Sequence, residues 1–210
     1  MMKIILLSAS IPDVRRDPKF WQPDKFVLIR ESIRALASVV LPKAFLIFGG
    51  HPAITPIVRQ VGARLDCLHN ALLFQSAFFE KDFPFDNRYF TPGKNYIITD
   101  PLENRDKSLK LMRSKMICTG DNAKERKQRL GREEYDAAIF IGGMEGVIEE
   151  FNLFRQCHPQ KPTYPVASTG AAAGEIAQEI WAKLELKGEI REALMNDTVY
   201  GAMFERLLFA

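Results

Sequence analysis

The sequence predicts an α/β protein with a doubly wound, mainly parallel sheet and helices on both of its faces. Short apolar runs such as 45–48 and 137–141 lack the alternation of half-exposed strands, which is typical of strands covered on both sides. Segments with apolar residues at helical spacing follow these runs. Strands that alternate with helices in this way pair in parallel through crossover connections.

The individual elements follow from the same patterns. We expect strands over residues 3–8, 45–48, 71–75, 96–98, 137–141 and 163–167. We expect helices over 24–40, from Pro52 or Pro56 to 65, over 102–117, from just after Gly143, and from the alanine-rich stretch to 184, with two short helices over 187–210. The aromatic segment 78–90 and the polar segment 119–133 show no regular pattern.

Length and composition indicate one domain over residues 1–185 with a helical appendage over 186–210. At 210 residues, 47% hydrophobic and 26% charged, the chain is long enough for one filled core and too short for two large domains. No stretch resembles a signal peptide or a membrane span, so we expect a cytoplasmic protein without membrane contact. Cys67, Cys118 and Cys157 lack metal-type spacing and the histidines do not cluster, so no metal, disulfide or cofactor is expected.

Four loops of small residues follow predicted strands and belong on one edge of the sheet. They are Ser8-Ala9-Ser10, Gly49-Gly50-His51, Gly142-Gly143 and Ser168-Thr169-Gly170. Glycine lets a ligand approach the backbone, and free N–H groups at the start of a helix favour an anion. We therefore expect phosphate or ribose at these loops, although small residues at strand ends are also ordinary turn chemistry.

The helix after Gly143 adds acids near the same edge. At 100° per residue, Glu150 lies beside the apolar stripe of Val147, Phe151 and Phe154, whereas Glu149 points almost opposite. Glu150 is therefore a candidate to accept hydrogen bonds from a sugar or a base. Glu145 and Glu149 are explained more simply as acids favoured by the helix dipole.

Two further segments have more than one interpretation. Residues 103–132 hold ten Lys/Arg and four Asp/Glu, which indicates either a solvated helix face or an electropositive rim for an anion. Nucleic acid is less expected, because aromatic residues do not interleave with these charges. The aromatic residues of 78–90 either bury against a second subunit or the local core, which we favour, or cover a ligand by stacking on a base.

Several motifs in the same order point to a family. The run Ile141-Gly-Gly-Met-Glu-Gly-Val-Ile-Glu-Glu150 resembles the PGGxGTxxE signature of the LOG proteins, which are Rossmann-like. Together with the runs 7–12, 48–56 and 166–170, it is similar to the branch of the SLOG superfamily often found beside or fused to TIR domains. The resemblance covers about residues 6–174.

The resemblance implies two activities. LOG enzymes hydrolyse the N-glycosidic bond of cytokinin nucleoside 5′-monophosphates, with a glycine turn at the phosphate and an arginine and the last glutamate of the signature at the ribose. SLOG domains of the defence-related branches instead bind nucleotide-derived signals, such as ADP-ribose and its cyclic forms, and pass the event to an attached effector.

Carried over residue by residue, the resemblance assigns Glu150 to the ribose. It assigns the phosphate to the matching glycines Gly142, Gly143 and Gly146, with Met144 and Glu145 between them as further ligand-binding candidates. Val147 stands where the signature has a threonine, which removes a phosphate-holding hydroxyl. Arg126 lies in a Glu-Arg-Lys run at the LOG-like distance before the glycines, whereas Arg113 lies in a clear predicted helix, and we prefer Arg113 as the ligand-facing arginine.

We therefore expect a sensing domain for a nucleotide-derived signal, such as ADP-ribose or cyclic ADP-ribose, in a bacterial TIR-linked anti-phage system. Its expected partners are a TIR-domain or other effector protein and further copies of itself. The alternative is a nucleoside 5′-monophosphate phosphoribohydrolase, in which Glu150 and an arginine promote departure of the base.

Overall fold

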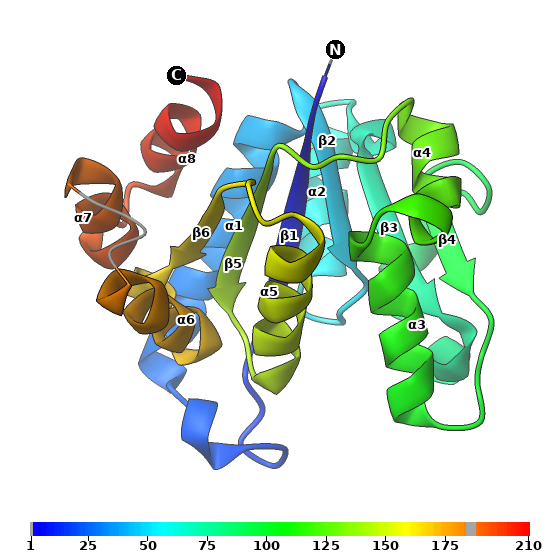
Figure 1. Ribbon diagram of the computed structural model, residues 1–210, viewed down its shortest axis with the longest axis horizontal. Helices are drawn as coiled ribbons and strands as arrows, with labels where there is room; N and C mark the ends of the chain where they lie inside the picture. Colours follow the sequence, from blue (N-terminus) through cyan, green and yellow to red (C-terminus); the bar gives the residue numbers. More distant parts are fainter. Residues whose placement is uncertain (1, 184–187) are drawn as a thin grey trace.

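The sheet has six strands in the order β4-β3-β2-β1-β5-β6, and each adjacent pair is parallel. The computed structural model describes residues 2–183 and 188–210. Its strands are β1 (Lys3–Ser10), β2 (Ala44–Gly49), β3 (Ala71–Ser76), β4 (Tyr96–Thr99), β5 (Ala137–Gly142) and β6 (Thr163–Val166). The chain builds outward from β1 to β4 and then returns to the other side of β1 at β5 (Figure 1). The predicted Rossmann-like α/β fold is thus confirmed.

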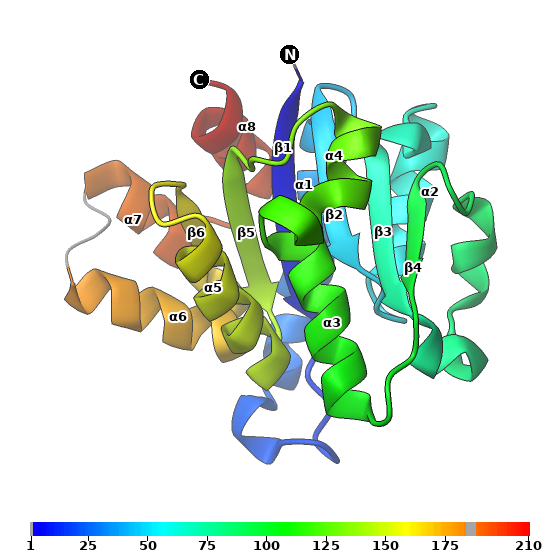
Figure 2. The ribbon, with the colours of Figure 1, turned by 45° about the vertical axis from the view of Figure 1, so that its right-hand side comes forward.

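Helices cover both faces of the sheet, as Figure 2 shows. α1 (Phe26–Val40) and α2 (Thr55–Arg64) lie on one face, and α3 (Arg105–Ile117) and α5 (Glu145–Cys157) lie side by side on the other, with α4 (Lys124–Leu130) after α3. α6 (Ala171–Ala182) and α7 (Gly188–Asn196) contact β6, and α8 (Tyr200–Phe209) packs on α1. None of the described helices is long and apolar enough to cross a membrane.

The central strands show why their sequences are uninterrupted apolar runs. Every residue of β5 is buried, because helices cover it from both sides. Its pairing with β1 runs from Ile5 opposite Ala137 to Ser10 opposite Gly142. Phe140 meets the ring of Phe151 edge-on, with the ring centroids 5.3 Å apart, so β5 and α5 are joined by a buried aromatic pair.

The segments without a regular pattern contain short helices. Residues 119–133 form the 3₁₀ turn Gly120–Ala123 and then α4, which ends at Gly131 in the left-handed conformation (φ 78°). The aromatic segment contains the 3₁₀ segments Ala77–Asp82 and Phe85–Tyr89.

α3 starts three residues later than expected, because the Asn104 side chain accepts a hydrogen bond from the Lys107 N–H at 2.9 Å and caps the helix there.

The C-terminal helix docks on the body of the domain. Met203, Phe204 and Leu208 of α8 are buried in the core. The Lys3 ammonium donates to the Leu208 carbonyl at 2.5 Å, so the start of β1 and the end of α8 meet at one end of the molecule, opposite the edge at which the strands finish (Figure 1). The domain boundary expected between residues 185 and 186 lies outside the described residues.

Candidate ligand-binding site

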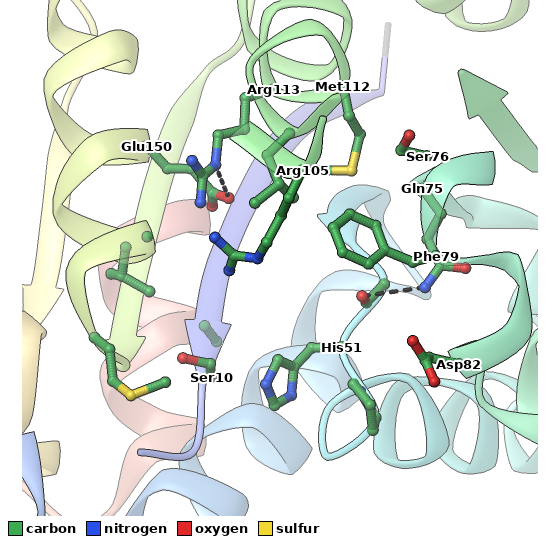
Figure 3. Close-up of a pocket in the computed structure, with 18 of the residues that line it drawn as sticks. Ser10, His51, Gln75, Ser76, Phe79, Asp82, Arg105, Met112, Arg113 and Glu150 are labelled. Atoms are coloured by element: carbon green, nitrogen blue, oxygen red, sulfur yellow. Dashed lines mark hydrogen bonds and ion pairs between the residues drawn. The ribbon is translucent and has the colours of Figure 1, made fainter. Parts of the chain in front are cut away.

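A cavity of about 350 Å³ opens where β1, β2 and β3 end (Figure 3). Ligands of open α/β sheets bind at this edge, beside the strands between which the chain reverses its direction. Here that reversal lies between β1 and β5. The sequence candidates that line the cavity are Ala9, Ser10, Gly49, Gly50, His51, Arg113, Met144, Gly146 and Glu150.

Glu150 is the acid of the cavity wall. Its carboxylate accepts a hydrogen bond from the Ser8 hydroxyl at 2.6 Å and another from Nε of Arg113 at 3.3 Å. Burial raises the pKa of Glu150 above its ordinary value, and the opposing effects of the Arg113 charge and the Ser8 hydroxyl do not cancel this rise. The ionised carboxylate can accept from a ligand hydroxyl, and the raised pKa also suits it to hold a proton.

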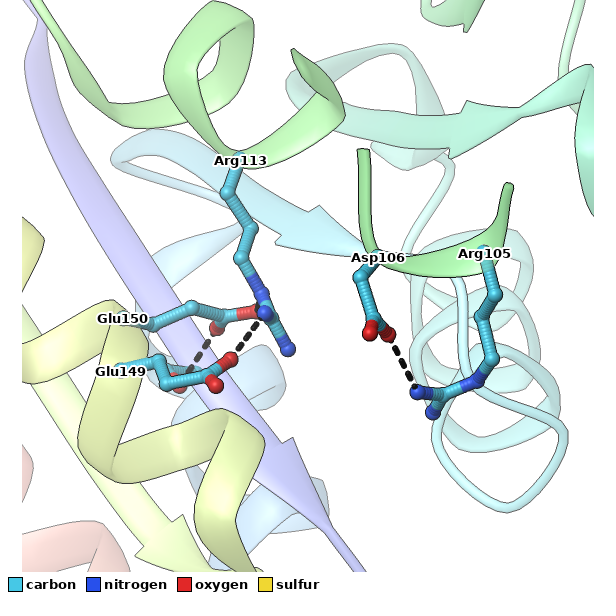
Figure 4. A network of polar contacts seen from close by, with 6 residues as sticks. Arg105, Asp106, Arg113, Glu149 and Glu150 are labelled. Atoms are coloured by element: carbon cyan, nitrogen blue, oxygen red, sulfur yellow. Dashed lines mark hydrogen bonds and ion pairs between the residues drawn. The ribbon is translucent and has the colours of Figure 1, made fainter. Parts of the chain in front are cut away.

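Arg113 connects α3 to α5 beside this acid. Its guanidinium pairs with Glu149 as well as with Glu150 (Figure 4). A Cβ on Gly146 would lie 2.7 Å from Nη2 of Arg113, so a glycine at this position lets the guanidinium lie over the first turn of α5. Arg113 therefore adds a full positive charge to the end of a helix that already favours an anion.

A second hollow of about 510 Å³ is lined by α3 and α5. It shares Arg16, Arg105 and Arg113 with the cavity, and the acids Asp106, Glu145 and Glu149 line it as well. Arg105 pairs with Asp106 at 3.2 Å (Figure 4). Part of the basic stretch 103–132 thus faces these hollows, where acids offset some of its positive charge.

His51 presents a neutral hydrogen-bond donor to the cavity. Its Nδ1 accepts from the Ala53 N–H at 3.2 Å, which leaves the ring proton on Nε2. Burial, with a smaller effect from the Arg16 charge, lowers the pKa of His51 to about 4. Since the ring points into the cavity (Figure 3), Nε2 can donate to a ligand oxygen at neutral pH.

The glycines of the turns are needed for the space they leave and for their backbone angles, because their own N–H groups already make hydrogen bonds within the fold. Gly50 donates to the Phe74 carbonyl, Gly142 to the Thr169 hydroxyl and Gly143 to the Ser10 carbonyl, at 2.8–2.9 Å. These donors are therefore already used and are not free for the phosphate that we expected them to hold. Gly142 and Gly143 have φ values of 56° and 89°, which only glycine adopts readily.

Neither Gly142-Gly143 nor the loop Ser168-Thr169-Gly170 lines the cavity, unlike the two small-residue loops after β1 and β2. The Ser168 hydroxyl lies 3.2 Å from the Tyr200 hydroxyl of α8. Thr169 bonds the Val166 carbonyl and Gly142, both within the fold. The loop after β6 therefore makes hydrogen bonds to β5 and α8 and does not face the cavity.

Arg126, the alternative arginine, lies in the interior. It is fully buried and donates to the carbonyls of Cys118 at 3.0 Å and Glu133 at 2.8 Å, and also to that of Met116. Its guanidinium lies 4.8 Å from the ring centroid of Tyr135. Arg126 thus holds the end of α3, the helix that carries Arg113.

Two other candidates do not line the cavity themselves. Glu145 lines only the second hollow, and Ser8 contacts the cavity residue Glu150 through its hydroxyl.

The sequence did not single out several lining residues. They include Gln75, Ser76, Leu109 and Met112. The position of Gln75 and Ser76 at the end of a predicted strand was an available signal, since such positions lie at the ligand edge. Phe79, Asp82 and Phe83 belong to the aromatic segment, for which stacking on a ligand was the less favoured interpretation, and Arg105 belongs to the basic stretch, for which an anion rim was one of two interpretations.

Three comparisons place the chain among known proteins. A family model described as the SLOG cluster3 family matches residues 19–208. An X-ray structure of TM1055, a structural genomics target, is similar with a TM-score of 0.47 and 14% sequence identity, over 84% of this chain and 81% of that one. No curated protein matches the sequence.

Proposed function

This chain belongs to the SLOG cluster3 family, and we propose that it binds a nucleotide-derived signal in the cavity at the ends of β1, β2 and β3. The observation that carries the proposal is the convergence of Arg113, Glu150 and His51 on one cavity. A guanidinium suits phosphate oxygens, a carboxylate accepts from ribose hydroxyls, and the neutral imidazole donates to either kind of oxygen.

The signal that we propose is ADP-ribose or a cyclic form of it, and the partner is a TIR-domain or other effector of a bacterial anti-phage system. The support for both is the resemblance of the four motif runs to the TIR-associated SLOG branch. Positive charge along the cavity and the second hollow suits a ligand with two phosphates. Binding would act by favouring one packing of protomers or effector over another.

The test is thermal unfolding with AMP, ADP-ribose, NAD and cyclic ADP-ribose isomers, followed by chromatography of each ligand. A ligand that binds only the folded state raises the Tm by mass action. We expect a shift with intact ligand, its loss in Arg113→Ala, and its retention in Arg64→Ala, which removes an exposed arginine far from both hollows. No shift with any of these ligands would refute the proposal.

One observation favours a second candidate, nucleotide N-glycosidase activity. Glu150 has a raised pKa and contacts an arginine, as a group that assists departure of a base requires. Val147 lines the cavity without the hydroxyl that the LOG signature supplies. Free base in the same chromatograms, absent with Glu150→Gln, would identify the enzyme; intact ligand at high protein concentration would exclude it.

A further inference from the structure

The cavity has two chemically different ends. Arg113, Glu150 and Ser10 lie on the side of β1 and α5, whereas the opposite side is formed by the segment that follows β3 and by one face of α3 (Figure 3). On that opposite side four apolar residues, Phe79, Phe83, Leu109 and Met112, line the cavity beside the polar Gln75, Ser76, Asp82 and Arg105.

The aromatic segment divides its side chains between three environments. Phe90 is buried in the core, 6.0 Å from the ring of Phe48. Phe85 and Tyr89 are exposed, and Arg88 and Arg59 lie over their rings. Phe79 and Phe83 are the rings that reach the cavity, so the segment is neither wholly core nor wholly surface.

The rings of Phe79 and Phe83 each contact another aromatic ring that does not line the cavity. Phe78 packs edge-on against Phe79, with centroids 5.1 Å apart, and Phe83 lies 6.3 Å from the ring of Tyr96. The 3₁₀ segment Ala77–Asp82 is interrupted at Phe79, whose backbone (φ −104°, ψ 15°) departs from helical values. This kink separates the cavity-facing Phe79 from the outward-facing Phe78, which is 41% exposed.

A carboxylate stands beside these rings. Asp82 lines the cavity, and among the described residues its side chain makes no ion pair or hydrogen bond. Asp82 and Glu80, two residues earlier in the same segment, are both exposed, but only Asp82 lines the cavity. Flat apolar surface next to a free acceptor suits a planar heterocycle that carries N–H donors.

We infer that Phe79, Phe83 and Asp82 form a base-binding subsite that selects a nucleobase with an exocyclic amino group, such as adenine. The base stacks on Phe79 against Leu109 and Met112, and its amino group donates to Asp82. This inference rests on the proposed function, because it assigns the base end of the same nucleotide whose phosphate and ribose face Arg113 and Glu150.

The test measures calorimetric affinities for AMP, purine riboside 5′-monophosphate, which lacks the amino group, and ribose 5-phosphate, which lacks the base. We expect wild type to bind AMP about tenfold or more tightly than the purine analogue, because a hydrogen bond to a charged acceptor is lost. Asp82→Ala should abolish this preference, whereas Glu80→Ala should keep it.

Stacking is tested separately. Phe79→Ala should weaken AMP binding about tenfold and leave ribose 5-phosphate unchanged, while Phe85→Ala, which truncates an exposed ring that does not line the cavity, changes both little. Phe79→Leu keeps apolar bulk and guards against a folding defect; it should lie between wild type and Phe79→Ala. If wild type binds AMP but Phe79→Ala and Phe85→Ala behave alike, the subsite is refuted and the proposed function stands. If wild type binds none of the three probes, the subsite is overturned, and the proposed function falls as well only if ADP-ribose, NAD and cyclic ADP-ribose also fail to bind.

Discussion

Gly50 cannot carry a side chain without displacing Gln75. A Cβ at this position would lie 2.2 Å from Nε2 and 2.3 Å from Cδ of Gln75. Gln75 is buried and cannot move freely, because Nε2 donates to the Gly50 carbonyl at 3.1 Å and Oε1 accepts from the Tyr96 hydroxyl at 2.7 Å and from the Asn87 amide. Gly50→Ala therefore forces apart a buried polar network at the cavity wall.

The magnitude follows from that network. Three hydrogen bonds at about 1 kcal/mol each are at risk, and partial relaxation keeps the expected loss in unfolding free energy at about 2–3 kcal/mol. For a chain of this size, that corresponds to a fall in Tm of roughly 4–12 °C. The neighbouring Gly49 is a matched control, since a Cβ there meets Met112 and Met116 only at ordinary distances of 3.8–4.0 Å.

Urea unfolding of both variants tests the argument. Gly49→Ala should stay within about 0.5 kcal/mol of wild type. In a Gln75→Ala background, Gly50→Ala should add little further loss, because the clash has been removed and the two effects are not additive. Equal midpoints for Gly49→Ala and Gly50→Ala would refute the reasoning.

Three further predictions concern buried charge and titration. Arg126→Ala should cost about 3–5 kcal/mol in urea unfolding, because it leaves several buried carbonyls unpaired. The folded pKa of Glu150 lies above its ordinary 4.5, so wild type should lose stability relative to Glu150→Gln as the pH rises through that folded pKa; parallel curves would contradict this. His51 should protonate near pH 4 in NMR titration, and since the unfolded chain takes up this proton near 6.5, stability should fall between pH 6.5 and 4 in wild type but less in His51→Gln.

The sheet could be predicted because its strands are covered on both faces. A short uninterrupted apolar run such as 137–141 is best explained as a strand that is buried on both faces. The helices beside it show apolar residues at a clear helical spacing. The start of α3 was harder, since the Asn104 cap competes with a pattern that reads equally well from residue 102. Short helices such as α4 lack enough residues to show a period at all.

The site could be predicted only in part, because a motif does not reveal how its hydrogen bonds are used. Thr169 and the glycines look like phosphate-binding groups in sequence, but Gly142 donates to Thr169 across the ends of β5 and β6, and Gly143 donates to Ser10. Arg113 and Arg126 were both plausible, and only the packing of α3 beside α5 and of α4 against the end of α3 separates the cavity-facing one from the interior one. Glu150 could be located because helical angles fix its side of α5.

The hydrogen bond between Lys3 and Leu208 places both described ends of the chain together, and this decides where the protein can be immobilised or fused to another protein. The described chain begins and ends at the end of the molecule opposite the strand tips (Figure 1), and the cavity opens at those tips. A tether on the C-terminal side would therefore hold the protein on a sensor chip with its mouth toward the solution. A reporter fused on either side would leave ligand entry unobstructed, and any change it reported on binding would have to cross the full length of the parallel strands.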